Sequence, residues 1–404
     1  MAFLNSKIII ILLLFSVFIV EAQEYIPVTK QIENSNIKTA AELTDKYLMF
    51  LKNKNIAVVA NQTSVINSTH LVDSLLSLGI RIKKVFCPEH GFRGDSEAGE
   101  IVQNTFDKKT NLPVISLYGK NKIPKKVDLE GIDAIIFDIQ DVGARFYTYI
   151  STLHYVMEAC AKNKIQLLLL DRPNPNGYYI DGPVLDMKFS SFVGMHAVPI
   201  VHGMTIGEYA SMINGEKWLK NGIQCKLKII TVSNYKHSDF YNLHIKPSPN
   251  LLNMSAIYLY PTLCLFEGTV VSVGRGTMKP FQILGHPKLD SCLFTFIPTS
   301  IKGMSTEPPF KNKLCCGYDL SDYSINILKN NRKLNLFWLI DLYKRISEKS
   351  EFFTPFFDKL AGTDMLRKQI IAGKTEEEIR KSWQADLIKF KTIRKKYLLY
   401  PDFE

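Results

Sequence analysis

Apolar residues form short continuous runs through the first half of the chain, and these runs predict strands. They cover residues 56–60, 82–87, 114–117, 134–139 and 165–170. Runs that are mostly apolar, without a regular alternation of apolar and polar positions, are typical of parallel strands buried on both faces. We therefore expect a parallel sheet with helices on its two sides.

A helical spacing of apolar residues fills two of the intervals between these strands. Residues 70–78 place leucines on one face and end before Gly79, a favourable helix stop. Residues 150–160 keep one apolar face between the fourth and fifth strands. The alternation of strand and helix predicts a doubly wound α/β fold for this part of the chain.

The rest of the chain has a different pattern. Residues 171–261 are rich in Pro, Asn, Gly and His, which favours long loops around one helix at residues 206–213. Further helices are predicted at residues 335–347, 364–372 and 375–392. The last of these begins with Thr and has Glu three residues later, the spacing of a capping box.

The N-terminus predicts a secretory signal peptide. Lys7 precedes an apolar run at residues 8–20, and the small residue Ala22 follows it. The run is short for a permanent membrane span, and no cysteine lies near the cleavage point. We expect cleavage of residues 1–22 and a periplasmic or secreted mature protein without a membrane span.

Composition narrows the chemistry. The chain carries a formal net charge of +11, spread along its length, and seven cysteines without a spacing typical of zinc ligands. No glycine-rich phosphate loop follows any of the strands. We therefore expect no metal, no cofactor and no nucleic-acid partner, and an attraction to anionic polymers of the cell envelope.

Candidate chemistry gathers where the predicted strands end, because open α/β sheets bind ligands outside the carboxyl ends of their strands. The loops that follow four of the strands begin at Asn61, Pro88, Gln140 and Asp171. Together they carry carboxylates, amides, guanidinium groups and aromatic rings. This mixture suits a sugar that has hydroxyl and amide groups and one apolar face.

Glu89 is the best single candidate for a general acid, since it directly follows a strand and has apolar neighbours. A pairing with Arg93 or a helix cap is the structural alternative. His90 either orients Glu89, shares its proton, binds substrate or has a structural role. Asp141 either binds substrate or caps the helix that follows it.

A second cluster lies beside glycines further along the chain. Glu267 precedes Gly268, and Arg275 stands between two glycines. Glycines in such places let the backbone approach a ligand closely, which favours a binding loop. The alternative is a structural ion pair between Glu267 and Arg275.

Five segments of the chain read as longer motifs. They are PEHGFRG (88–94), FDIQDVGARFYTY (137–149), DRPNPNG (171–177), HGMTIGE (202–208) and CLFEGTVVSVGRGT (264–277). On these motifs the chain resembles the exo-acting β-N-acetylmuramidases of the NamZ type. The resemblance extends from about residue 55 to the C-terminus, with the motifs in order.

The resemblance implies a fold, an activity and a site. The fold would be a Rossmann-like, doubly wound catalytic domain, here residues 45–285, with a smaller α+β auxiliary domain, residues 286–404. The activity would be release of terminal N-acetylmuramic acid from the non-reducing end of peptidoglycan fragments, with Glu89 as the acid. The other site residues that it implies are His90, Gln140, Arg145, Tyr147, Asn174, His202, Glu267 and Arg275.

Two questions stay open at this point. The second catalytic group is Glu267, Asp138, Asp141, a water held by His90, or the acetamido group of the substrate. The guanidinium that holds the lactyl carboxylate of muramic acid is that of Arg145 or Arg275, unless both form structural pairs.

Two other functions compete with the glycosidase. One is an envelope carbohydrate esterase or amidase, in which Glu89 and His90 activate a water molecule. The other is a peptidoglycan-binding protein without catalysis. Free sugar as the product, rather than acetate or peptide, separates the glycosidase from both.

Overall fold

The structure is a computed structural model that describes residues 36–94, 104–323, 328 and 330–404. The expected signal peptide, residues 1–22, lies outside the described residues. Within the described ranges, every helix is too short or too polar to cross a bilayer.

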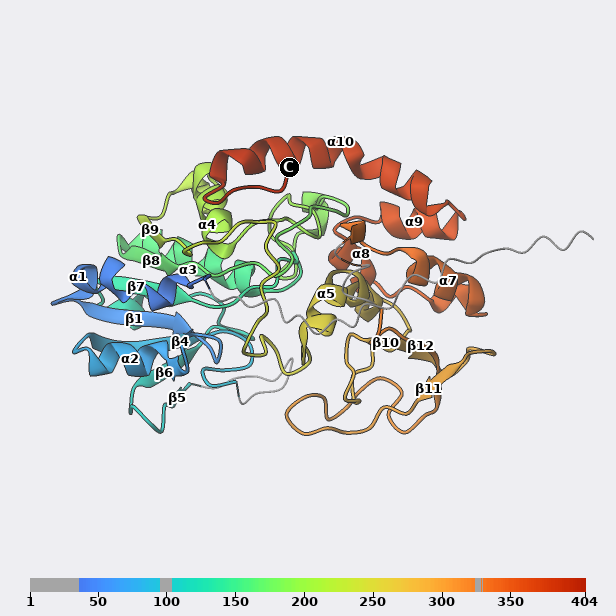
Figure 1. Cartoon of the computed structure of the whole chain (residues 1–404), viewed down its shortest axis with the longest axis horizontal. Helices are drawn as coiled ribbons and strands as arrows, with labels where there is room; N and C mark the ends of the chain where they lie inside the picture. Colours follow the sequence, from blue (N-terminus) through green and yellow to red (C-terminus); the bar gives the residue numbers. More distant parts are fainter. Residues whose placement is uncertain (1–35, 95–103, 324–327, 329) are drawn as a thin grey trace, which may run out of the picture. The chain divides into compact units, whose positions relative to one another are not determined.

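A seven-stranded sheet forms the centre of the first half of the chain (Figure 1). Its strands are β1 (Asn55–Ala60), β4 (Arg81–Cys87), β5 (Thr105–Phe106), β6 (Pro113–Ser116), β7 (Ala134–Asp138), β8 (Gln166–Leu170) and β9 (Leu227–Ile230). The order is β5-β6-β4-β1-β7-β8-β9, and all neighbours are parallel except β5 and β6. A separate two-stranded hairpin joins β2 (Val65–Ile66) to β3 (Thr69–His70).

All five predicted strands are confirmed, as β1, β4, β6, β7 and β8. The sequence pattern missed β5 and β9, which are the two edge strands. Most positions of β9 are only half-buried and both residues of β5 are exposed, so neither has the continuous apolar run of a central strand.

Successive residues of the central strands alternate between two apolar layers. In β1, Ala57 and Val59 belong to one layer, and Ile56 and Val58 belong to the other. Helices cover both faces of the sheet, which explains why the strands have no polar side. The first layer includes α3 (Tyr149–Asn163) and α4 (Ile206–Gly215), and the second includes α1 (Leu48–Leu51) and α2 (Leu71–Ser77).

The second half of the chain combines helices with a small antiparallel sheet. Its elements are α5 (Met254–Leu263), β10 (Ile283–His286), β11 (Phe294–Phe296), β12 (Cys315–Asp319), α7 (Phe337–Arg345), α8 (Phe356–Ala361), α9 (Met365–Ile371) and α10 (Glu376–Arg394). The strand β12 lies between β10 and β11, and a disulfide joins Cys316 of β12 to Cys292. The three predicted helices are confirmed as α7, α9 and α10, and the capping box of α10 is present.

The end of the chain returns to the large sheet. Tyr400 donates a hydrogen bond of 2.5 Å from its hydroxyl to the carboxylate of Asp171, which follows β8. The guanidinium of Arg394, at the end of α10, donates to the carbonyl oxygen of Gly203 at 2.7 Å. The DRPNPNG and HGMTIGE motifs thus hold the C-terminal segment in place, as α10 passes over α4 in Figure 1.

Candidate active site

Buried polar groups hold the ends of β7 and β8 together. The Asp138 carboxylate, at the end of β7, forms an ion pair with Arg172, and 2.6 Å separate Arg172 Nε from Asp138 Oδ1. A second hydrogen bond from Arg172 reaches the other carboxylate oxygen at 2.9 Å. Both oxygens of Asp138 are therefore engaged, so this residue is not free to act as the second catalytic group.

A cavity of about 200 Å³ lies at this edge of the sheet, and residues that follow β4, β6 and β7 line it. Half of the predicted site residues line it, namely Glu89, His90, Tyr147, Glu267 and Arg275. Its other walls are mostly aromatic and include Tyr118, Phe146, Tyr149, Phe192, Tyr260 and Phe281, while α8 adds Phe356 and Leu360. Segments far apart in the sequence thus meet around one small space.

The loop after β4 turns sharply to present Glu89. His90 and Gly91 adopt φ angles of +72° and +77°, and the Gly91 N–H donates to the carbonyl oxygen of Pro88 at 3.2 Å. A positive φ at a residue other than glycine is uncommon and is found where a tight turn is fixed by its surroundings. The turn leaves Glu89 half-buried and His90 buried in the cavity wall.

Arg93 has partners other than Glu89. Its guanidinium lies 2.7 Å from the carboxylate of Asp107 and 3.1 Å from that of Asp73. The Arg93 hydrogen bonds hold the pKa of Asp107 well below its usual range. The structural alternative for Glu89, a pairing with Arg93, is therefore wrong.

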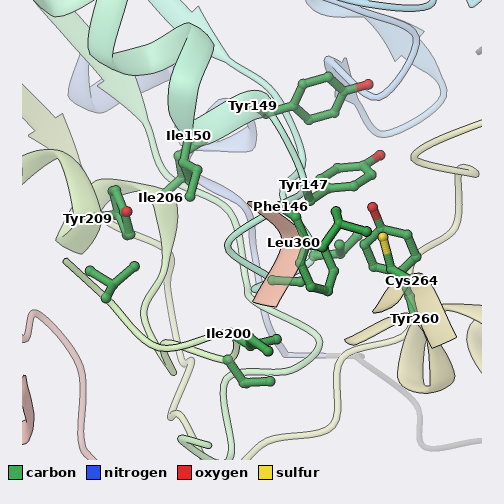
Figure 2. Close-up of a cluster of buried hydrophobic side chains, with 14 of the residues drawn as sticks. Phe146, Tyr147, Tyr149, Ile150, Ile200, Ile206, Tyr209, Tyr260, Cys264 and Leu360 are labelled. Atoms are coloured by element: carbon green, nitrogen blue, oxygen red, sulfur yellow. The ribbon is translucent and has the colours of Figure 1, made fainter. Parts of the chain in front are cut away.

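A row of tyrosines forms one wall of the cavity. Figure 2 shows Tyr149, Tyr147 and Tyr260 in succession, and their ring centroids are 4.8 Å apart for the first pair and 5.7 Å for the second. The hydroxyls of Tyr147 and Tyr149 donate to the carbonyl oxygen of Pro247 at 2.8 and 3.2 Å. Burial raises the pKa of all three phenols, so they stay neutral and give the cavity an aromatic wall.

Glu267 and Arg275 form the charged part of the cavity wall. Arg275 Nε lies 2.7 Å from Glu267 Oε1. The Arg275 side chain is 21% exposed and the Glu267 side chain is 25% exposed. Burial lowers the pKa of Arg275, but Glu267 and its neighbours together raise it by more. The predicted ion pair therefore exists, and it faces the cavity instead of a sealed core.

The Arg275 guanidinium keeps unused donors. Its only hydrogen bond within the described ranges runs from Nε to Glu267, and the ring centroid of Phe281 lies 5.2 Å from its central carbon. The two Nη groups therefore remain available to a ligand of the cavity.

Glycines are required by the packing of this loop. A Cβ on Gly268 would lie 2.4 Å from the Cα of Phe357, and Gly274 and Gly276 both have φ of +78°. No other residue fits the first position without a backbone shift, and the other two conformations are strained for any residue with a Cβ. The loop is thereby fixed against α8, with Glu267 at the cavity.

Arg145 does not line the cavity. Its side chain is 0% exposed, and its Nη1 donates to the carbonyl oxygens of Pro183 and Val198 at 2.8 and 2.7 Å. Nη2 donates to the carbonyl oxygen of Leu360 at 2.9 Å. Burial lowers the pKa of this guanidinium to about 9. We had expected a substrate contact, and the structure instead has Arg145 joining two loops to α8.

Gln140, Asp141, Asn174 and His202 are also buried away from the cavity. Gln140 Nε2 donates to a carbonyl oxygen of the loop after β8 at 2.7 Å, and Asn174 Nδ2 donates to one just before α4 at 2.8 Å. Asp141 accepts a backbone N–H two residues later at 2.7 Å. Burial lowers the pKa of His202 to about 3, so its ring is neutral. These side chains stabilise loops instead of facing the cavity.

Tyr118 is the most informative residue that sequence reasoning missed. It directly follows the third predicted strand, residues 114–117, whose end was not considered among the candidate loops. Applying the strand-end rule to all five strands would have included it. Within residues 36–94, 104–323, 328 and 330–404, no three His, Cys, Asp or Glu side chains gather as a metal site would require.

Two carboxylates and an aromatic wall around one small cavity are typical of the active site of a glycosidase. Comparison with known protein families gives a specific assignment. Residues 56–255 match the N-terminal part of the exo-β-N-acetylmuramidase NamZ family, and residues 258–400 match its C-terminal part. The chain therefore belongs to the NamZ family.

Individual proteins are also similar to this chain over most of its length. The chain is 39% identical over 379 residues to the peptidoglycan β-N-acetylmuramidase NamZ of Bacillus subtilis, covering 89% of this chain and 90% of that protein. A crystal structure of a DUF1343 family protein of Bacteroides fragilis is similar with a TM-score of 0.86 and 47% identity, over 91% of this chain and 100% of the other. The crystal structure of a second DUF1343 family protein of that organism is similar with a TM-score of 0.74 and 27% identity, over 90% of this chain and 99% of the other.

Proposed function

We propose that this chain is an exo-acting glycosidase that releases terminal N-acetylmuramic acid from the non-reducing end of peptidoglycan fragments. The observation that carries the proposal is the cavity, which holds Glu89 and the Glu267–Arg275 pair within about 200 Å³. Pockets for drug-sized ligands usually start near 300 Å³, so a space of this size suits one sugar ring. A site for a single terminal sugar fits exo action. Membership of the family supports the same activity.

In the proposed reaction, Glu89 protonates the glycosidic oxygen as the bond to the anomeric carbon breaks. Glu267 is the proposed second group, because among the described residues it is the other carboxylate that lines the cavity, and Arg275 holds it in place. It would either stabilise the positive charge that develops on the sugar ring or form a bond to the anomeric carbon, and a water molecule would then add its hydroxyl to that carbon and return a proton to Glu89. Asp138 is engaged by Arg172, and Asp141 does not reach the cavity. The acetamido group of the substrate and a water held by His90 are the remaining alternatives.

We also propose that Arg275 recognises the lactyl carboxylate, the group that distinguishes muramic acid from N-acetylglucosamine. Its Nε binds Glu267, and both Nη groups are available within the described ranges. A guanidinium matches a carboxylate in charge and in geometry. The other candidate, Arg145, has both Nη atoms bonded to backbone carbonyl oxygens.

For the fold, we propose a Rossmann-like, doubly wound catalytic domain at residues 45–285 and a smaller α+β auxiliary domain at residues 286–404. The strand order supports the first part. Numbered along the chain, the parallel strands β6-β4-β1-β7-β8-β9 read 3-2-1-4-5-6, the order typical of dinucleotide-binding folds. The auxiliary domain would contribute α8 to the cavity wall.

For the location, we propose export to the periplasm or the cell exterior, with removal of residues 1–22. The sequence of the N-terminus supports this proposal. The disulfide between Cys292 and Cys316 supports it independently, because such bonds persist in oxidising compartments outside the cytoplasm.

Product analysis tests the proposed function. The mature chain is incubated with a MurNAc–GlcNAc disaccharide and with a peptide-substituted muropeptide, and the products are separated by mass. Free N-acetylmuramic acid is expected from the disaccharide. Release of acetate or of peptide without any free sugar would instead favour an esterase or amidase.

A further inference from the structure

Glu89 and Tyr118 reach the cavity from neighbouring strands. The strands β4 and β6 are parallel, and Cys87 at the end of β4 is paired with Ser116 at the end of β6. Glu89 and Tyr118 each stand two residues beyond this pair. Equal steps along two adjacent parallel strands lead to the same edge of the sheet, and both side chains line the cavity there.

Tyr118 also interacts with Glu89. Burial raises the pKa of the Tyr118 phenol, and the charge of the nearby Glu89 carboxylate adds to the rise. The charge of Glu89 acts on Tyr149 as well, but the Tyr149 hydroxyl already donates to Pro247 and accepts from Asn61. Of the two phenols that the charge of Glu89 affects, Tyr118 is therefore the one whose hydroxyl is not already bound to the surrounding loops within the described residues.

The other charged and titratable groups near Glu89 occupy different positions. Arg93, on the same loop, is bonded to Asp73 and Asp107. Among the described residues, the other ionisable groups that line the cavity besides Tyr118 are His90, Tyr147, Tyr149, Tyr260, Cys264 and the Glu267–Arg275 pair. These groups are the same in the parent and in a Tyr118 variant, so a difference between the two proteins reports the effect of Tyr118 on Glu89.

We infer that Tyr118 is the positioning residue of Glu89: its hydroxyl holds the carboxyl group in the orientation from which the proton reaches the glycosidic oxygen. The inference rests on the proposed function, in which Glu89 is the general acid. A neutral phenol donates to one carboxyl oxygen and leaves the other oxygen to carry the proton. After the proton has moved to the leaving group, the same hydrogen bond stabilises the carboxylate that remains.

The variant Tyr118→Phe tests this inference, because it removes the hydroxyl and keeps the ring. Two substrates are compared, a MurNAc–GlcNAc disaccharide and a nitrophenyl glycoside of N-acetylmuramic acid. The sugar leaving group needs a proton and nitrophenol does not. We expect kcat on the disaccharide to fall roughly 10- to 100-fold, the scale of one hydrogen bond to a charged group. The fall on the nitrophenyl glycoside should be several times smaller, and KM should change little on both.

The pH profile supplies a second readout. The hydroxyl favours the ionised form of the acid, so its loss should move the alkaline limb of the kcat profile to higher pH. A purely structural role of Tyr118 would not move this limb. Tyr397→Phe is the matched control, since the Tyr397 hydroxyl is bonded to Glu216 at 2.7 Å and does not line the cavity. The control should keep the parent profile.

The possible failures are distinguishable. A parent chain that releases no sugar from either substrate would refute the proposed function itself. An active parent with an equally active Tyr118→Phe variant would overturn the inference alone. An equal loss on both substrates would also overturn it, because a group needed for attack at the anomeric carbon is required whatever the leaving group is.

Discussion

Two groups of polar side chains occur in the motifs of this chain, and they differ in what surrounds them. Glu89, Glu267 and Arg275 line a cavity and keep part of their surface exposed. Arg145 and His202 are 0% exposed, and their hydrogen bonds involve backbone groups. A charged residue in a motif is therefore no guide to substrate contact until its burial is known.

The buried group has a definite structural task. A buried ion or amide without partners would cost several kcal/mol, and here backbone groups supply most of the partners. Arg145 joins two loops to α8, and Asp171 binds Tyr400 near the C-terminus. The buried side chains thus stabilise the loops and helices around the cavity that Glu89, Glu267 and Arg275 line. The following substitutions should separate the two groups by their effects on activity and on stability.

The largest effect is expected for Glu89→Gln. The amide keeps the shape of the side chain but cannot donate the catalytic proton, so kcat on the disaccharide should fall about 10³-fold or more. The melting temperature should stay within about 2 °C of the parent value, since the Glu89 side chain is only half-buried and the amide keeps its shape. Glu130→Gln, an exposed glutamate away from the cavity, is the control. Parent activity in Glu89→Gln would remove Glu89 from the mechanism.

Arg145→Met should show the opposite behaviour. The variant removes the guanidinium donor from three buried carbonyl oxygens, of which that of Val198 still accepts from the Leu185 N–H, and this should lower the free energy of unfolding by about 2 to 4 kcal/mol. Denaturant unfolding followed by tryptophan fluorescence measures this loss. At a temperature where the variant is folded, KM should change little. An intact unfolding midpoint combined with a raised KM would mean that Arg145 belongs to the substrate group after all.

The fold could be predicted where burial gives a segment a recognisable apolar pattern in the sequence. The central strands are mostly apolar because both faces of the sheet are covered, so all five were found. The edge strand β9 reads Leu-Lys-Ile-Ile and is mostly half-buried, so it was merged into a loop region. The helix α5 contains Pro261, and β12 contains a glycine and two cysteines, which are weak signals for either element.

The site could be predicted only in part, for a related reason. The strand-end rule selected Glu89 correctly as a cavity residue, but it selected Gln140 and Asn174 equally. Both arginine candidates stand among small residues, and no local pattern reveals that Arg145 points into the core while Arg275 points into the cavity. Such a distinction depends on long-range packing, here that of α8, which lies far along the chain.

Arg275→Lys sharpens the assignment of the lactyl carboxylate. Lysine keeps the charge but loses the bidentate geometry, so transition-state binding of the muramic acid substrate should weaken by about 1.5 to 3 kcal/mol, the scale of a charged hydrogen bond. Any weak glucosaminide activity should fall far less, because that sugar lacks the carboxylate. The comparison uses kcat/KM on matched nitrophenyl glycosides of the two sugars. Equal losses on both would assign Arg275 to holding Glu267 alone.

The smallest effect tests whether Asp141 belongs to the buried group, through the pH dependence of stability. Burial raises the pKa of Asp141 to about 7, with backbone N–H groups partly opposing the rise. Its ordinary value is near 4, so the folded state binds the proton more tightly than the unfolded state between these two pH values. The stability contributed by this group is thus complete below about pH 4 and is lost as the pH rises through about 7. Asp141→Asn stays neutral throughout, and its amide oxygen can still accept the backbone N–H. Relative to the parent, its free energy of unfolding should therefore improve by about 1 to 2 kcal/mol between pH 6 and pH 8. The exposed Asp45→Asn should show no such trend, and curves for Asp141→Asn and the parent that run parallel would mean that Asp141 is hydrated and ionised in the folded protein.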